Sequence, residues 1–95
     1  MPVKINHKEN LIERHLVRRV QELGGIAEKV TVIGARGFFD RLVVLPKNRI
    51  IFVECKRPHR GLISAHQISR HQRYRALGAA IAIVATLEDI DRLLN

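Results

Sequence analysis

The sequence has a single cysteine, no tryptophan and only four aromatic residues among its 95 positions. The lone cysteine, Cys55, cannot form an internal disulfide, and there is no second cysteine to build a structural zinc site, although five histidines leave metal binding possible. So few aromatic side chains provide no stacking platform for single-stranded nucleic acid. The cysteine content favours a reducing compartment, and we therefore expect an intracellular protein.

The sequence also lacks a long apolar segment. The apolar run at residues 78–85 is far shorter than the roughly 18 residues that a membrane-spanning helix needs. The polar start, residues 1–6, has no hydrophobic stretch of the kind found in signal peptides. We expect neither export nor membrane insertion.

Acidic residues are scarce, because nine Asp and Glu stand against 17 Lys and Arg, which gives a formal charge of +8. This excess favours a polyanionic partner over a neutral metabolite, and nucleic acid is the first candidate. A hydrophobic content of 46% is typical of a folded chain rather than a disordered one. The length suffices for one domain and not for two, so we expect a single domain over residues 1–95.

Apolar periodicity, capping residues and turn residues divide the chain into short alternating elements. A first helix begins after the capping residue Asn6 and ends at the glycine pair 24–25, and a second runs from Ser64 to Gly78. The uniformly apolar strand 79–85 is expected at the centre of the sheet, buried on both faces. The order αβββαβα predicts an α/β fold with a mixed sheet flanked by helices. The remaining elements are the strands 26–33, 38–45 and 50–56 and a short last helix that begins after the capping residue Thr86.

Two acidic residues stand out in the most basic part of the chain. Between Lys29 and Leu87 only Asp40 and Glu54 are acidic, and both fall on predicted strands. Strand alternation puts Glu54 and Lys56 on one face of their strand. A charged pair on an otherwise apolar strand indicates a function at that position.

The loop between the second and third strands decides whether Asp40 shares that face. A three-residue loop, with Pro46 preset for a turn and Asn48 tolerating the left-handed conformation, places Asp40 near Glu54. A four-residue loop turns Asp40 away. We favour the three-residue loop, because its turn chemistry matches the sequence.

Two carboxylates at one end of a sheet repel each other, and a divalent cation offsets this repulsion while also binding a substrate phosphate. Lys56 beside such a site can orient a water or stabilise charge on phosphoryl oxygens, and the metal would lower the pKa of the water and act as a Lewis acid. The pattern predicts phosphodiester hydrolysis. The alternative is a surface ion pair between Glu54 and Lys56, with Asp40 capping a turn.

The spacing of Asp40 and the run Glu54-Cys55-Lys56 resembles the core of the PD-(D/E)xK nucleases. Four segments are similar to the VRR-NUC branch, the virus-type replication-repair nucleases: 37–40, 52–58, 63–64 and 67–78. The resemblance implies a restriction-endonuclease-like αβββαβ core. For a small stand-alone member it also implies the cytoplasm of a bacterial cell or of a phage-infected host.

The same resemblance implies which residues form the site. Mg²⁺ or Mn²⁺ would be bound by Asp40, Glu54 and the backbone carbonyl of Cys55. Phe39 stands where the family usually has proline, a change that affects the local backbone more than the chemistry. The residues that match the family's catalytic positions are these: Asp40, Glu54, Lys56, Gln67 and Glu13.

Some of these positions also have a purely structural interpretation. Glu13 lies within the apolar arc of its helix, so it can equally be a buried partner for a basic residue. The capping box at the start of the second helix accounts for Gln67 by itself, and both interpretations can hold together. Gln67, His71 and Tyr74 share one helix face, which could be presented to DNA or to the site, and for His71 a plain surface position is favoured over a role as ligand.

Arginines near the proposed site are assigned to DNA phosphates: Arg36, Arg57, Arg60, Arg70 and Arg73. No base-reading motif is recognisable, which favours recognition by shape. We therefore expect a metal-dependent DNA endonuclease that is selective for branched, flap or junction DNA and acts in DNA repair. The alternatives are a Holliday-junction resolvase acting as a dimer and a noncatalytic nucleic-acid-binding module.

A homodimer is expected as well. The first helix and the last helix, which carries Ile90, Leu93 and Leu94, have more apolar surface than one thin sheet layer covers. A two-fold dimer would bring two basic clefts to one DNA surface.

Overall fold

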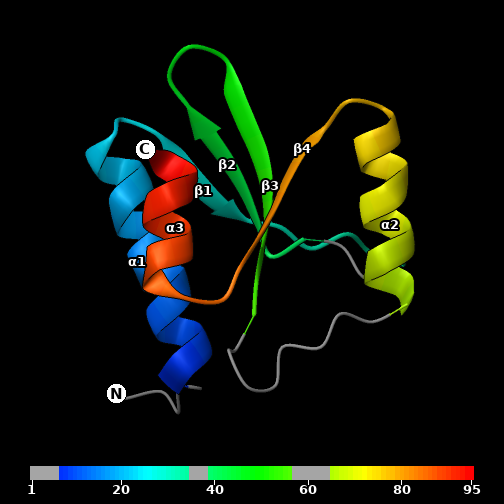
Figure 1. Ribbon diagram of the computed structural model, residues 1–95, viewed down its shortest axis with the longest axis horizontal. Helices are drawn as coiled ribbons and strands as arrows, with labels where there is room; N and C mark the ends of the chain where they lie inside the picture. Colours follow the sequence, from blue (N-terminus) through cyan, green and yellow to red (C-terminus); the bar gives the residue numbers. More distant parts are fainter. Residues whose placement is uncertain (1–6, 35–38, 57–64) are drawn as a thin grey trace.

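The computed structural model describes residues 7–34, 39–56 and 65–95, which form a four-stranded sheet and three helices (Figure 1). The strands lie in the order β1-β2-β3-β4, with the first two pairs antiparallel and β4 parallel to β3. The predicted element order and the mixed sheet are confirmed. The elements are α1 His7–Glu22, β1 Ile26–Lys29, β2 Arg41–Leu45, β3 Arg49–Cys55, α2 Ala65–Ala76, β4 Ala80–Val84 and α3 Leu87–Leu94.

The helices cover the two faces of the sheet unequally. Helices α1 and α3 pack side by side against one face, and α2 packs against the other (Figure 1). Strand alternation on β3 follows this division, because Val53 and Cys55 are buried in the core with α1 and α3 while Phe52 meets Tyr74 of α2. Glu54 therefore points to the α2 side of the sheet.

The hairpin between β2 and β3 has the predicted three-residue loop. Leu45 pairs with Arg49, which leaves residues 46–48 as the loop, and Lys47 and Asn48 adopt φ angles of 65° and 63°. The left-handed conformation expected at Asn48 is confirmed, and Lys47 shares it. At the other end of the hairpin the last pair is Arg41 with Val53, so the residues before and after it, Asp40 and Glu54, lie opposite each other.

Strand β4 does not lie at the centre of the sheet, and this prediction is wrong. Among the described residues β4 pairs only with β3, and its side chain Ile83 is partly exposed. The two central positions belong to β2 and β3, each of which pairs on both sides. The apolar sequence of β4 suggested a central strand, but its small alanine side chains are packed by α2 on one face of the sheet and by α3 on the other.

Strand β1 is shorter than the sequence predicted. It ends at Lys29, and beyond it Val30 N donates a single hydrogen bond of 3.3 Å to Asp40 O. The β-branched residues that follow pair with no strand of the described ranges, and Ile33 is 98% exposed. Their β propensity alone does not make a strand, because a strand needs a neighbour to pair with.

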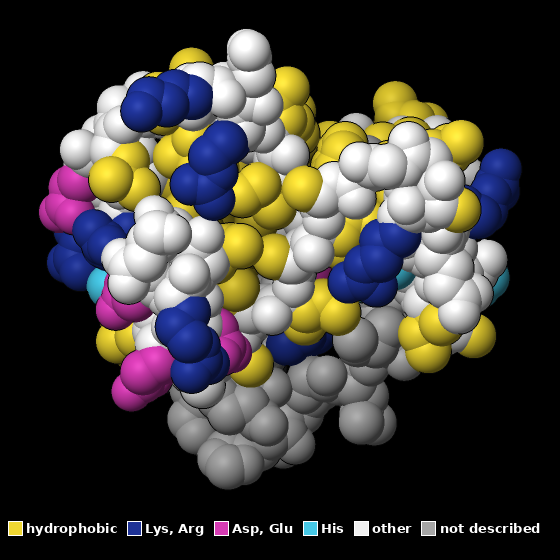
Figure 2. All heavy atoms as spheres, turned by 45° about the horizontal axis from the view of Figure 1, so that its top comes forward, with side chains coloured by type: hydrophobic (Ala, Val, Ile, Leu, Met, Phe, Trp, Pro, Cys, Tyr) yellow, Lys and Arg dark blue, Asp and Glu magenta, His cyan; other side chains and the backbone are white. Residues whose placement is uncertain are grey.

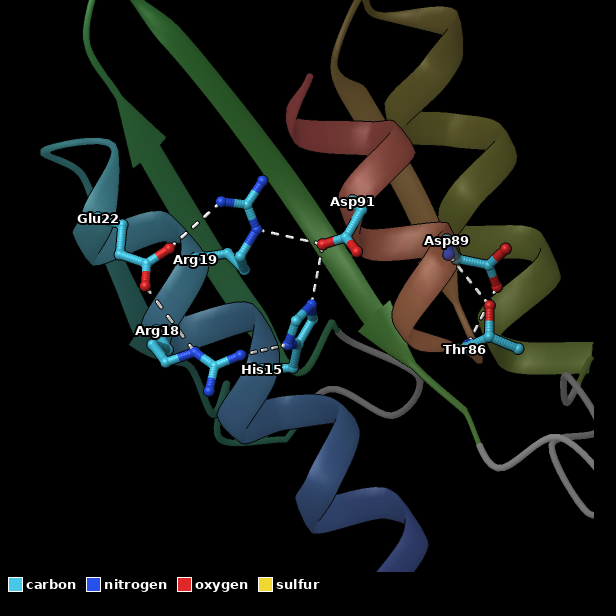
Figure 3. Close-up of polar contacts among 7 residues, drawn as sticks. All are labelled: His15, Arg18, Arg19, Glu22, Thr86, Asp89 and Asp91. Carbon is cyan, nitrogen blue, oxygen red and sulfur yellow. Dashed lines mark hydrogen bonds and ion pairs between the residues drawn. The ribbon is translucent and has the colours of Figure 1, made fainter.

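Helix α3 begins with the predicted cap. Thr86 Oγ1 accepts a hydrogen bond from Asp89 N at 3.0 Å, and Asp89 Oδ2 accepts one from Thr86 N at 3.1 Å, which forms a capping box (Figure 3). The proposed caps of the other two helices, Asn6 and Ser64, lie outside the described residues.

Polar side chains tie α3 to α1 (Figure 3). Asp91 Oδ1 accepts hydrogen bonds from His15 Nε2 at 2.9 Å and from Arg19 Nε at 3.1 Å. Beneath them Ile90 and Leu94 are buried in the core of the same chain, so they do not form the exposed apolar surface on which the sequence argument for a dimer rested. No helix within the described ranges is long and apolar enough to cross a membrane.

Candidate active site

Three of the predicted site residues contact one another between the end of β3 and the first turns of α2. Glu54 Oε2 accepts from Lys56 Nζ at 3.0 Å and from Gln67 Nε2, and Lys56 Nζ also donates to Gln67 Oε1 at 3.0 Å. Each of the three therefore contacts the other two. Because the side chain of Gln67 lies in this cluster, the helix cap alone does not account for this glutamine.

Asp40 approaches the same cluster from the neighbouring strand. Its Oδ2 accepts a hydrogen bond from the backbone N of Cys55 at 2.8 Å, which holds the carboxylate against the β3 segment that carries Glu54. Burial and, next, the charge of Asp40 raise the pKa of Glu54, against the opposing effect of Lys56 and Gln67. The structure thus brings the two carboxylates together, as the hairpin register predicted.

One oxygen of this cluster indicates a further ligand. Glu54 is only 3% exposed, and its Oε1 has no hydrogen-bond partner among the described residues. A buried carboxylate oxygen without a donor is costly, and a hard divalent cation is a group that satisfies it.

The donor set of the described residues fits Mg²⁺ or Mn²⁺. It consists of the carboxylates of Asp40 and Glu54, beside the backbone of Cys55, and both cations bind oxygen ligands of this kind with water and substrate completing the coordination. The described part of the chain holds no group of three or more His, Cys, Asp or Glu side chains that could act as metal ligands. Softer metals that need several cysteines or histidines are therefore not favoured here.

Glu13 takes part in a different contact. It is largely buried and pairs with Arg41 Nε at 3.0 Å and more loosely with Lys29 Nζ at 3.9 Å. Arg41 also donates to the backbone oxygen of Ala27 at 3.1 Å. Of the two interpretations of Glu13, this geometry favours the partner of a basic residue, and that residue directly follows Asp40.

The side chain of Cys55 lies on the core side of β3, as the strand alternation predicted. It is buried, and burial, followed by the charges of Asp40, Glu13 and Glu54, raises the pKa of its thiol far above the usual value. A thiol in this state is no nucleophile. Cys55 therefore contributes its backbone to the site and its side chain to the core.

Basic side chains continue from the site along α2. Arg70 and Arg73 line a hollow of about 600 Å³ together with His66 and Ser69, beside Gly34. On the face shown in Figure 2, Lys and Arg side chains are spread over both halves while Asp and Glu gather at one side. The other arginines assigned to DNA lie outside the described residues: Arg36, Arg57 and Arg60.

Sequence reasoning missed an aromatic cluster beneath the site. Phe39 stacks on His71 with ring centroids 4.7 Å apart and planes 13° apart, and both rings are buried. Phe52 and Tyr74 complete the cluster, with Phe39 centroids 5.1 and 5.5 Å away. The expectation that His71 lies on the surface is wrong, because Phe39 covers it. The spacing of Gln67, His71 and Tyr74 on one helix face was the available signal.

Comparison with known proteins gives extensive matches to a curated protein and to a solved structure. A curated protein of Acyrthosiphon pisum secondary endosymbiont phage 1, named "Putative nuclease p44", is 45% identical over 87 residues, which cover 92% of this chain and 91% of that protein. A solved structure of a VRR_NUC domain matches with a TM-score of 0.86 and 33% identity, over 92% of this chain and 94% of that one. No family model matches the sequence.

The mixed four-stranded sheet between α1 and α3 on one side and α2 on the other is thus the fold of a VRR-NUC domain. The similarity in sequence extends over nearly the whole of both relatives. The chain belongs to the VRR-NUC family of nucleases.

Proposed function

We propose that this protein is a DNA endonuclease that hydrolyses phosphodiester bonds with Mg²⁺ or Mn²⁺ bound at Asp40 and Glu54. The observation that carries the proposal is the buried Glu54 Oε1, which has no partner among the described residues although Oε2 of the same carboxylate has two. A carboxylate that only completes an ion pair has no reason to keep one oxygen buried and unbonded. The bound cation would lower the pKa of a water and polarise the phosphodiester.

The residues around the carboxylates have separate tasks in this proposal. Gln67 uses both ends of its amide, because Nε2 donates to Glu54 and Oε1 accepts from Lys56, so it fixes the distance between the carboxylate and the ammonium. Lys56 Nζ is held as a positive charge at the edge of the site, where it can orient a water or stabilise charge on the phosphoryl oxygens. The carbonyl of Cys55 would be a third ligand to the cation. Glu13 acts through Arg41 rather than on the substrate.

Cleavage assays test this proposal. The wild-type protein should cut labelled DNA with Mg²⁺ or Mn²⁺ and not in the presence of a chelator. Lys56→Ala should lose about 100-fold or more in rate and still bind Mn²⁺ in calorimetry, because its ammonium acts on the water or the phosphate and not on the ion. Metal-independent cleavage would refute the metal site, and loss of Mn²⁺ binding in Lys56→Ala would give the lysine a structural role. Binding without cleavage under any metal would favour the noncatalytic nucleic-acid-binding module.

The DNA backbone is proposed to follow α2. Arg70 and Arg73 line the same hollow on the helix whose first turns carry Gln67, so phosphates bound there lead towards the carboxylates. Arg70→Gln with Arg73→Gln should weaken DNA binding and reduce the salt dependence by roughly 0.9 logarithmic units for each lost duplex phosphate contact. Arg92→Gln on α3, on the other side of the sheet, is the matched control and should bind as the wild type does. An equal loss in the control would mean that only net charge matters.

Contacts to phosphates rather than to bases favour a substrate chosen by its structure, such as branched, flap or junction DNA. A comparison of linear, flap and four-way substrates tests this part of the proposal. Equal rates on all three would refute structure selectivity. Paired cuts on opposite strands of the four-way substrate would favour the resolvase.

A homodimer is proposed on a different surface from the one that the sequence suggested. Ile26, Val44 and Ile50 are cross-strand neighbours and form an exposed apolar ladder on the sheet face away from α1 and α3. A two-fold axis lets such a patch cover itself in a second copy. Light scattering at micromolar concentration should give about twice the 10.9 kDa of one chain. Val44→Glu should give a monomer and Leu87→Glu, on α3, should not; a monomeric wild type would refute the dimer.

A further inference from the structure

The residue before Asp40 is held by three aromatic rings. Phe39 is 1% exposed, and its ring stacks on His71, meets Tyr74 edge to face and lies tilted against Phe52. Phe39 directly precedes Asp40, whose carboxylate lies opposite Glu54. Movement of the Phe39 ring would therefore move the backbone of Asp40.

The other side of the same stack belongs to α2. His71 follows Gln67 by one helical turn, and Tyr74 follows His71 by about one more turn. Gln67 in turn contacts Glu54 and Lys56. The stack between Phe39 and His71 thus connects the segment that carries Asp40 with the helix that carries Gln67.

His71 is an unusual residue for this place if it serves only to fill space. Its side chain is buried, at 2% exposed, and its Nε2 has no hydrogen-bond partner among the described residues. Burial, followed by the charges of Arg75 and Lys56, lowers the pKa of His71, which favours the neutral form of the ring, and the ring lies nearly parallel to the face of Phe39. The imidazole of His71 therefore contributes a flat aromatic surface against which Phe39 stacks.

We propose that Phe39 and His71 are positioning residues, whose stack sets the separation of Asp40 from Gln67 and Glu54 and thereby the geometry of the proposed metal site. The inference rests on the proposed function of that site. Neither ring touches the reacting atoms, and both act through the residues that do. Displacement of a catalytic group by about 1 Å is enough to lower a rate by about 100-fold.

Three substitutions on one helix test the proposal. His71→Phe keeps an aromatic surface without ring nitrogens, His71→Leu removes the flat ring at similar volume, and Ile68→Ala changes an exposed residue of the same helix as the control. Cleavage rates and Mn²⁺ affinity by calorimetry are measured for each variant. Urea denaturation establishes that each variant is folded under the assay conditions.

We expect His71→Phe and Ile68→Ala to remain within about threefold of the wild type in both rate and Mn²⁺ affinity. His71→Leu should cleave about 100-fold more slowly and bind Mn²⁺ several-fold more weakly while still folded. Phe39→Leu should give the same loss, and the two leucine substitutions together should lose little more than either one, because both remove the same stack. If His71→Leu does not fold, Phe39→Leu and its Mn²⁺ affinity provide the test alone.

The outcomes separate this proposal from the proposed function. Wild-type rates and affinities in both leucine variants would show that the stack is only packing and would overturn the inference. A His71→Phe variant as slow as His71→Leu would overturn it too, because the imidazole itself would then be required. Cleavage by the wild type without any metal would instead refute the metal site, and the rates of the variants would still decide whether the stack positions the carboxylates and Gln67.

Discussion

The substitution Glu54→Gln should strongly lower the rate of DNA cleavage without lowering the stability of the fold. The substitution keeps the shape of a buried side chain, and the amide can still bond to Lys56 and Gln67, so the local packing survives. What is lost is the negative charge, and with it one of the two carboxylates available to a cation. We expect the rate of DNA cleavage to fall by at least about 1000-fold, which corresponds to about 4 kcal/mol of transition-state stabilisation.

The stability should not fall with the activity. Burial and the nearby Asp40 raise the pKa of Glu54, which means that the folded protein disfavours the ionised form of this side chain. The stability that a protonated Glu54 contributes is lost as the pH rises through its raised pKa, so at neutral pH the charge is a cost. A neutral amide removes this cost, and we expect the free energy of unfolding to stay equal or to rise by about 1 kcal/mol.

Urea denaturation at neutral pH without metal measures the stability, and a labelled DNA duplex with Mg²⁺ measures the rate. Glu28→Gln is the matched control, because Glu28 is an exposed glutamate on β1 of the same sheet. The control should change neither quantity appreciably. Cleavage by Glu54→Gln at the wild-type rate would remove Glu54 from the site. A loss of several kcal/mol in its stability would mean that the residue is a structural ion-pair partner.

Three further substitutions test the fold by urea denaturation. Lys47→Gly should raise the free energy of unfolding by about 0.5 to 1 kcal/mol, because Lys47 has a φ of 65° that favours glycine; a decrease would contradict this. Asp89→Asn should lower it by about 1 kcal/mol at neutral pH. Hydrogen bonds from the backbone N of Ala85 and Thr86 hold the pKa of Asp89 below its ordinary 3.8. The wild type is therefore more stable than Asp89→Asn by the full amount above pH 3.8, and this difference in stability disappears as the pH falls through the lowered pKa. A difference in stability that persists in strong acid would refute the assignment. Ile90→Ala should cost about 3 kcal/mol, since Ile90 is fully buried, and a loss below 1 kcal/mol would mean that α3 is loosely packed.

The parts of the fold that could be predicted are those that local chemistry determines. The loop 46–48 contains its own turn residues, so the register of the hairpin and the opposition of Asp40 and Glu54 followed from the sequence. The cap of α3 at Thr86 is equally local. Features of this kind depend on neighbouring residues and not on how distant segments assemble.

The features that could not be predicted depend on assembly. The apolar composition of β4 does not reveal whether another strand lies beside it. The β-branched residues after Lys29 do not reveal that, within the part of the chain that the structure describes, they pair with no strand. The helical spacing of His71 places it on the same face as Gln67 without revealing that Phe39 covers it. For Glu13 the sequence left two roles open, and only the position of Arg41 distinguished them.

The reactivity of Cys55 can be used to measure local opening of the fold at β3. Cys55 is the only cysteine of the chain, its thiol faces the core, and its backbone holds Asp40. A thiol-specific reagent can modify it only when β3 separates from the helices above it, because burial keeps the thiol protonated and out of reach. The rate at which the reagent modifies Cys55 under native conditions therefore measures how often this strand opens, without an engineered cysteine.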